Sequence, residues 1–264
     1  MYNDNDKYSN NDFNLSDLEE DEKYKSPLKS ILIKLFSVVV LIAFLSLSFS
    51  QLFPLITSEN FSFLTESNKL NDNPVVESIK PAVVYLNVKN SKGTMITSGQ
   101  GTGFNICSDG LIVTNHHLLE NAVSATIEFS DGKSFTSNNF KKIPDIDLAF
   151  IFIEGENLPK ASLQNTLAST NETVFIIGNP LGFPNIAVQG KIGNHYRSDN
   201  EDFYLFEIDS DIRKGNSGSP VVNKNGKVVG IVFALTQIQI EDDIESRALA
   251  ISASNLDYYI PEHE

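Results

Sequence analysis

The chain has 264 residues, of which 41% are hydrophobic, so it can bury a substantial core. Its 34 acidic and 20 basic residues give a formal net charge of -14, which repels phosphate backbones and argues against nucleic acid as a partner. A single cysteine, Cys107, excludes an intramolecular disulfide and a thiolate metal cluster, and any imidazole chemistry must use His116, His117, His195 or His263.

The N-terminal region predicts a membrane anchor. Residues 1–30 are polar and charged, and we interpret them as a disordered cytoplasmic tail. No charged residue occurs from Leu35 to Ser58, and about 20 such residues cross a bilayer core. We therefore predict a transmembrane signal anchor over 31–57, and favour it over a cleaved signal peptide because the preceding region is long and acidic. Lysines precede the span, so the positive-inside rule places the N-terminus in the cytoplasm and the rest in the periplasm or another extracytoplasmic space.

A linker is predicted over 58–73, followed by one domain over 74–260. Within this domain, short β-type runs alternate with turn signals such as "SDG" at 108–110, "SDGK" at 130–133 and "NKNGK" at 223–227. No long segment with helical periodicity interrupts them, which predicts an all-β barrel or sandwich. The expected strands are 82–88, 101–107, 111–117, 124–130, 148–154, 172–178, 185–192, 203–209, 220–223, 227–235 and 247–253.

The run "DIRKGNSGSP" at 211–220 is a candidate nucleophile loop. Ser217 lies between two glycines, and Gly215 allows the backbone to turn so that its own amide and that of Ser217 point at one spot. Such a pair of amides can stabilise an oxyanion. The alternative interpretation is a plain Gly-Asn-Ser turn.

A serine hydroxyl needs a base, and the base needs a carboxylate to orient it. His117 in "IVTNHHLLENA" is the candidate base, at the end of a predicted strand and before a short helical turn. A structural histidine, or a metal site of His116, His117 and Glu120, are the alternatives. Asp147 in "DIDLAFIFI" is the candidate carboxylate, because it precedes a strongly apolar strand, and Asp145 competes with it.

The three candidate residues occur along the chain in the order His, Asp, Ser. The region that contains them, from about Val75 to Leu256, resembles the trypsin-like bacterial proteases of the HtrA (Deg) family. The similar segments are "GQGTGFNICSDGLIVTNHHLLENA", "DIDLAFIFI", "FIIGNPLG", "IDSDIRKGNSGSPVVNKNGKVVGI" and "RALAISASN". The resemblance selects His117, Asp147 and Ser217 as the catalytic residues and the amides of Gly215 and Ser217 as the oxyanion hole. It implies two six-stranded antiparallel β-barrels with the active site between them.

The sequence also departs from the family pattern. Lys214 and Arg213 stand where proline and asparagine are common, and Ser219 replaces a glycine, as in glutamyl endopeptidases. Those enzymes usually carry a histidine where this chain has Val232, so a glutamyl preference is not supported. The sequence ends at Glu264, and we expect a family member that lacks a PDZ domain.

Asp211 lies six residues before Ser217, where trypsin-like enzymes place the base of the primary specificity pocket. An acid there would attract Lys or Arg side chains. The alternative is that Asp211 faces solvent, since HtrA relatives mostly prefer small aliphatic residues.

We expect a membrane-anchored serine endopeptidase acting on unfolded or exposed proteins outside the cytoplasm. Its partners are polypeptide substrates and the membrane, not nucleic acid, and no metal or organic cofactor is implied. HtrA relatives are often trimers, so the resemblance also raises a homo-oligomer. The alternative function is a protease-fold binding or chaperone-like module with low or latent activity.

Overall fold

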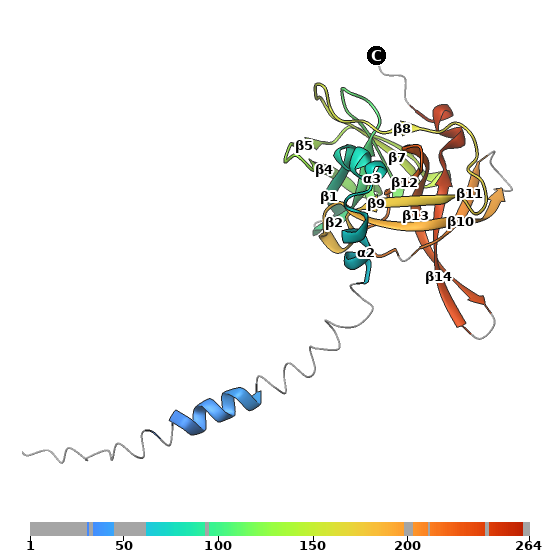
Figure 1. The fold of residues 1–264 in the computed structure, drawn as a ribbon. Helices are drawn as coiled ribbons and strands as arrows, with labels where there is room; N and C mark the ends of the chain where they lie inside the picture. Colours follow the sequence, from blue (N-terminus) through green and yellow to red (C-terminus); the bar gives the residue numbers. More distant parts are fainter. Residues whose placement is uncertain are drawn as a thin grey trace, which may run out of the picture. The chain divides into compact units, whose positions relative to one another are not determined.

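Two sheets of seven strands each form most of the chain after Val83 in the computed structural model (Figure 1). The structure describes residues 31, 34–44, 62–92, 95–197, 203–210, 212–240 and 243–260. The chain divides into two compact units, Met1–Ser58 and Glu59–Glu264. Both sheets belong to the second unit, so the all-β prediction for this region is confirmed.

The first sheet has the order β5-β4-β1-β2-β3-β7-β6, with every neighbouring pair antiparallel. Its strands are β1 (Val83–Lys92), β2 (Met95–Asn105), β3 (Leu111–Thr114), β4 (Ala122–Phe129), β5 (Ser134–Ser137), β6 (Phe140–Ile143) and β7 (Leu148–Phe152). The short helical segments around it are α3 (Pro74–Ile79), η3 (Lys80–Ala82), α4 (His116–Leu119) and η4 (Pro144–Ile146).

The second sheet has the order β12-β9-β10-β11-β14-β13-β8, and an additional β12–β13 pairing closes six antiparallel strands into a barrel. The seventh strand, β8, pairs in parallel with β13. Its strands are β8 (Ser162–Leu163), β9 (Thr173–Gly178), β10 (Ile186–Arg197), β11 (Tyr204–Asp209), β12 (Pro220–Asn223), β13 (Lys227–Ile240) and β14 (Asp243–Ser252), accompanied by η5 (Pro180–Gly182) and η6 (Ala253–Tyr258).

The prediction of two closed six-stranded barrels is therefore only half correct. The second barrel closes, but in the first sheet no ladder joins the described edge strands β5 and β6. These strands have four residues each and are connected by Asn138 and Asn139. The connection satisfies its polar groups locally: the Ser137 hydroxyl donates to the Phe152 carbonyl and accepts from the Asn139 amide, and the Phe152 amide donates to the Asn139 carbonyl. With β5 and β6 at its two edges, the sheet forms a half-barrel.

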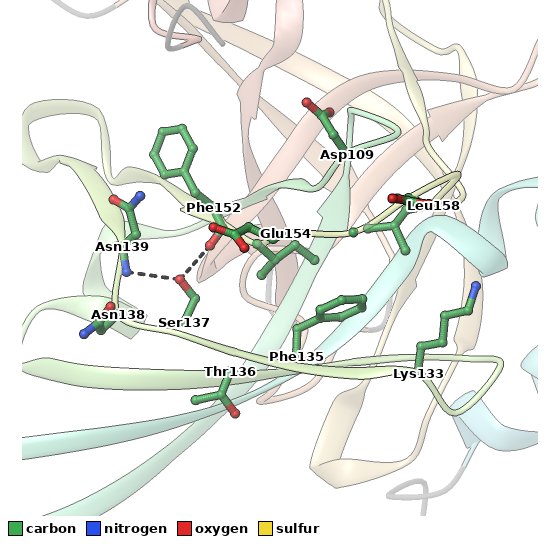
Figure 2. A pocket seen from close by; sticks show the side chains of 13 residues that line it. Asp109, Lys133, Phe135, Thr136, Ser137, Asn138, Asn139, Phe152, Glu154 and Leu158 are labelled. Carbon is green, nitrogen blue, oxygen red and sulfur yellow. Dashed lines mark hydrogen bonds between the residues drawn. The ribbon is translucent and has the colours of Figure 1, made fainter. Parts of the chain in front are cut away.

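An open pocket of about 1010 Å³ lies at this gap (Figure 2). Its walls are β5 with the following asparagines on one side and the end of β7 with residues 153–158 on the other. Figure 2 shows the two Ser137 hydrogen bonds at its edge. None of the predicted catalytic residues lines this pocket.

A helix, α2 (Ser62–Leu70), occupies most of the predicted linker. Phe63 and Ser67 are four residues apart, so they share one face of the helix, and both are buried. This face packs on β10, which pairs with β9 on its other side. The Ser67 hydroxyl and the Glu66 carboxylate accept hydrogen bonds from the amides of Ala187 and Gln189 in β10. The helix thus satisfies strand amides at this edge.

Three apolar clusters hold the second unit together. One fills the half-barrel and another fills the closed barrel. The third lies between them, where Phe104 and Phe150 of the first sheet pack in the same cluster as Phe175 and Ile231 of the second. Because these side chains are almost fully buried, the shared cluster fixes the two sheets relative to each other.

Outside this domain, a helical segment covers residues 34–44, within the predicted anchor. Among the described residues, no helix combines the length and the apolar composition needed to span a bilayer. The predicted tail, 1–30, and residues 45–57 of the predicted anchor lie outside the described residues.

Candidate active site

His117 and Asp147 meet at one end of the first sheet. His117 lies in α4, directly after β3, and Asp147 directly precedes β7, which pairs with β3. The Asp147 Oδ2 lies 2.8 Å from the His117 Nδ1. The His117 side chain is 44% exposed and that of Asp147 is 25% exposed, so the pair lies at the surface and not inside the core. A carboxylate that accepts a hydrogen bond from Nδ1 favours the imidazole tautomer in which Nδ1 carries the proton. In that tautomer Nε2 is free to accept a proton.

Asp147 also holds the backbone around the histidine. Its Oδ1 accepts the His117 amide at 2.8 Å, while its carbonyl accepts the His116 amide and the Asn115 side-chain amide, both at 3.1 Å. Asp147 adopts a left-handed conformation with φ 51°, which is uncommon outside glycine but tolerated best by Asp and Asn. The competing residue, Asp145, is exposed and lies in η4. The geometry therefore pairs Asp147, not Asp145, with His117.

Ser217 lies in the loop between β11 and β12 of the second sheet, and this loop is attached to the first sheet through Thr102 of β2. The Thr102 amide donates to the Ser217 carbonyl at 3.0 Å, and its hydroxyl donates to the Gly215 carbonyl at 2.8 Å. The Thr102 carbonyl in turn accepts the Thr114 hydroxyl at 2.7 Å. Thr114 ends β3, three residues before His117. Two short links thus join the serine loop to the strand that precedes the histidine.

No hydrogen bond joins the Ser217 hydroxyl to His117 within the described part of the chain. The structure therefore brings two of the three predicted residues into direct contact and anchors the third on the adjoining strands.

Among the five residues 215–219 of the serine loop, the amides of Gly215 and Ser217 have no acceptor within the described part of the chain. The neighbouring amides of Asn216, Gly218 and Ser219 donate to the carbonyls of Arg213, Val232 and Asn216. The two free donors are two residues apart, as the sequence predicts for an anion-binding pair.

Gly218 allows the close approach of the two sheets. It adopts φ +84°, and a Cβ built there would lie 1.9 Å from the Thr102 carbonyl oxygen and 2.5 Å from the Thr114 hydroxyl. No side chain fits at this position. We expect Gly218→Ala to lower the free energy of unfolding by about 3 kcal/mol or more, from left-handed strain together with the collision.

Gly132 is the matched control. It adopts a similar φ of +88°, but a Cβ there would meet nothing within 4 Å. Gly132→Ala is therefore expected to cost about 1 kcal/mol from strain alone. Denaturant unfolding of both variants measures the difference, and equal losses would contradict the collision.

The departure at Ser219 has a packing explanation. Ser219 is fully buried, and its hydroxyl lies 3.5 Å from the Asn216 Oδ1. A Cβ at Gly178 would fall 2.1 Å from the Ser219 hydroxyl. Serine is therefore accommodated because residue 178 is a glycine.

Asp211, the candidate specificity residue, lies outside the described residues. His116 is half-buried next to His117, and His195 lies on β10 against the ring of Phe206. Within the described ranges, no group of three or more His, Cys, Asp or Glu side chains could hold a metal ion. Sequence reasoning missed Thr102, which forms the hydrogen bonds between the first sheet and the serine loop, and Thr114, which bonds to Thr102. The sequence feature that could have identified these two threonines is a polar residue within a strand segment that is otherwise apolar and buried.

The trypsin-like peptidase domain family matches residues 101–231, which include all three predicted catalytic residues. The probable periplasmic serine endoprotease DegP-like of Chlamydia trachomatis serovar D is 36% identical over 142 residues, which is 52% of this chain and 28% of that protein. The mitochondrial serine protease HTRA2 of Drosophila willistoni is 31% identical over 172 residues, covering 60% of this chain and 40% of that protein. The chain thus spans less than half the length of these relatives.

Solved structures give the same result. The active form of the Rv3671c protease from M. tuberculosis superposes with a TM-score of 0.61 and 26% identity, over 72% of this chain and 83% of that one. The serine endoprotease from Yersinia pestis gives a TM-score of 0.58 and 25% identity, over 70% of this chain and 64% of that one. Residues 101–231 thus match a trypsin-like peptidase domain, and the chain is similar in sequence and fold to serine endoproteases of the HtrA/DegP type.

Proposed function

We propose that this protein is a membrane-anchored serine endopeptidase that hydrolyses peptide bonds in unfolded or exposed proteins outside the cytoplasm. The catalytic residues of the proposal are Ser217, His117 and Asp147. The observation that carries it is the hydrogen-bonded His117–Asp147 pair, together with a serine loop whose Gly215 and Ser217 amides have no acceptor among the described residues.

In the proposed reaction the Ser217 Oγ attacks the substrate carbonyl carbon while the His117 Nε2 takes the hydroxyl proton. Asp147 keeps the imidazole oriented and stabilises its protonated form. The C–N bond then breaks, His117 gives the proton to the leaving amine, and an acyl-enzyme remains. Water, deprotonated by His117, hydrolyses the ester and restores Ser217.

The amides of Gly215 and Ser217 would bind the oxyanion of each tetrahedral intermediate. The Asn216 carbonyl accepts the Ser219 amide at 2.9 Å. In a trans peptide the N–H points opposite to the C=O, so this bond directs the Ser217 N–H away from the Ser219 amide. An oriented donor of this kind contributes roughly 3–4 kcal/mol to catalysis.

The bond between Ser217 and His117 would form during substrate binding. Catalytic hydrogen bonds are often long in ligand-free enzymes and shorten in the Michaelis complex. The links through Thr102 and Thr114 join the serine loop to the strand that precedes His117.

Hydrolysis of unfolded casein by a soluble fragment of residues 59–264 tests the proposal. This fragment contains the whole second unit, including α2. We expect casein cleavage and covalent labelling by a fluorophosphonate. Labelling without cleavage would indicate a latent enzyme, and neither result, from a folded fragment, would favour the binding or chaperone-like module.

The membrane anchor is supported by the uncharged run from Leu35 to Ser58. We expect the full chain to remain with membranes after carbonate extraction, and a chain lacking 31–57 to be released. Protease accessibility in intact cells or vesicles then reports on which side the domain lies. Release of the full chain by carbonate would contradict the anchor, without affecting the catalytic proposal.

A further inference from the structure

A tight turn borders the proposed oxyanion hole and contacts the peptide group that carries one of its donors. The turn is η5 with the residue before it, Asn179. The Leu181 amide donates to the Lys214 carbonyl at 2.9 Å. The turn and the serine loop pack closely against each other at Gly215. A Cβ built at Gly215 would lie 2.8 Å from the Asn179 carbonyl oxygen and 3.0 Å from the Leu181 nitrogen.

This hydrogen bond determines the orientation of the Gly215 amide. The Lys214 carbonyl and the Gly215 N–H belong to one planar trans peptide group, so they point in opposite directions. With the carbonyl held by Leu181, the N–H must point away from the turn. The next peptide group is also held, since the Gly215 carbonyl accepts the Thr102 hydroxyl. Rotation of the Lys214–Gly215 peptide would therefore break the bond to Leu181.

The turn itself is firmly placed. Leu181 adopts φ 53° and ψ 20°, a left-handed conformation that costs energy for a residue with a side chain and persists only where its surroundings impose it. Its side chain is 54% exposed, so burial of the leucine does not explain that conformation. The Asn179 amide donates to the Thr102 hydroxyl, and its buried side chain donates to the Val84 carbonyl.

The other end of the turn contacts α2. The Phe183 amide donates to the Pro180 carbonyl, and the Phe183 ring packs edge-on against Phe63, with ring centroids 6.2 Å apart. Phe63 is buried in the apolar cluster of the closed barrel. A helix that lies before the residues of the family match therefore restrains this turn.

We infer that the Leu181 backbone amide is a positioning group for catalysis, which holds the Lys214–Gly215 peptide in the orientation that presents the Gly215 N–H to the oxyanion. The inference rests on the proposed function, because it assigns a role in the same reaction. Leu181 acts through Gly215 and does not touch the reacting atoms.

Replacing the Leu181 amide with an ester, by incorporation of the α-hydroxy analogue of leucine, removes this one donor and keeps the side chain. We expect kcat to fall about ten- to a hundredfold, less than the full loss of an oxyanion donor, with little change in KM. Affinity for a peptidyl boronic acid, which mimics the tetrahedral intermediate, should fall by a similar factor.

An ester at Phe183 serves as the matched control. It removes a hydrogen bond within the turn and leaves the bond to Lys214 intact, so it should change kcat much less. Equal losses from the two esters, or an unchanged boronic acid affinity in the Leu181 ester, would overturn the inference.

Amide hydrogen exchange separates this inference from the proposed function. If the wild-type fragment shows no Ser217-dependent turnover, the proposed function fails. The hydrogen bond is then judged by the exchange rate of the Leu181 amide in the folded fragment. Slow exchange would support the positioning contact, and exchange as fast as that of an exposed loop amide would overturn it.

Discussion

Casein hydrolysis by Ser217→Ala is expected to fall by about 10⁴- to 10⁶-fold in kcat/KM relative to the wild-type 59–264 fragment. The reason is chemical: without the Ser217 hydroxyl no acyl-enzyme forms, and only transition-state binding by the remaining groups is left. Fluorophosphonate labelling should disappear in the same variant. The Ser217 carbonyl, which bonds the Thr102 amide, is retained, so the fold should persist.

Ser219→Ala is the matched control for this result. Ser219 lies two residues further along the same loop, but it is fully buried and packs against Gly178. Its loss removes a hydroxyl without touching the proposed nucleophile, so hydrolysis and labelling should be largely retained. If Ser217→Ala cleaved casein as fast as Ser219→Ala, Ser217 would not be the nucleophile.

Asp147→Asn is expected to lower kcat by about 10⁴-fold, as the same change does in the Ser-His-Asp triad of related fold and role. The asparagine oxygen can still accept the His117 amide, so the local backbone should be kept. Its NH₂ group would then face the His117 Nδ1, which becomes an acceptor. The ring proton moves to Nε2, and His117 can no longer take the proton of Ser217.

Asp145→Asn controls for the loss of a negative charge in this segment. Asp145 lies two residues upstream and is exposed, and the hydrogen bonds to His117 come from Asp147. The kcat of Asp145→Asn should stay near that of the wild type. NMR of the His117 ring should show the change of tautomer only in Asp147→Asn. Similar kcat values for the two variants would remove Asp147 from the mechanism.

Strands were predicted well where local pattern is sufficient. The expected runs at 124–130, 172–178 and 203–209 match β4, β9 and β11 to within two residues at each end. The turn signals at 130–133 and 223–227 lie at the β4–β5 and β12–β13 connections, where Gly132 and Gly226 have positive φ. These features follow from alternating side chains and from glycine's freedom, both of which are local.

Other elements were missed because long-range contacts create them. The edge strands β5 and β6 are short and polar, and α2 was predicted as part of a linker. The α2 helix is stabilised by packing Phe63 into the closed barrel and by accepting amides from β10, and no nearby residue in the sequence indicates either contact. The Ser137 hydroxyl likewise bonds to the carbonyl of Phe152, 15 positions away, and no local pattern predicts that contact.

The sequence by itself predicted the all-β class, the resemblance to the HtrA (Deg) proteases and the candidate residues His117, Asp147 and Ser217, because residue types and their order carry that information. Only the tertiary structure decided that Asp147 and not Asp145 bonds to His117, that Thr102 joins the serine loop to the first sheet, and that Leu181 holds the Lys214–Gly215 peptide. Each of these is a hydrogen bond between residues at least 30 positions apart. Such bonds depend on how the two sheets pack, which no local pattern in the sequence encodes.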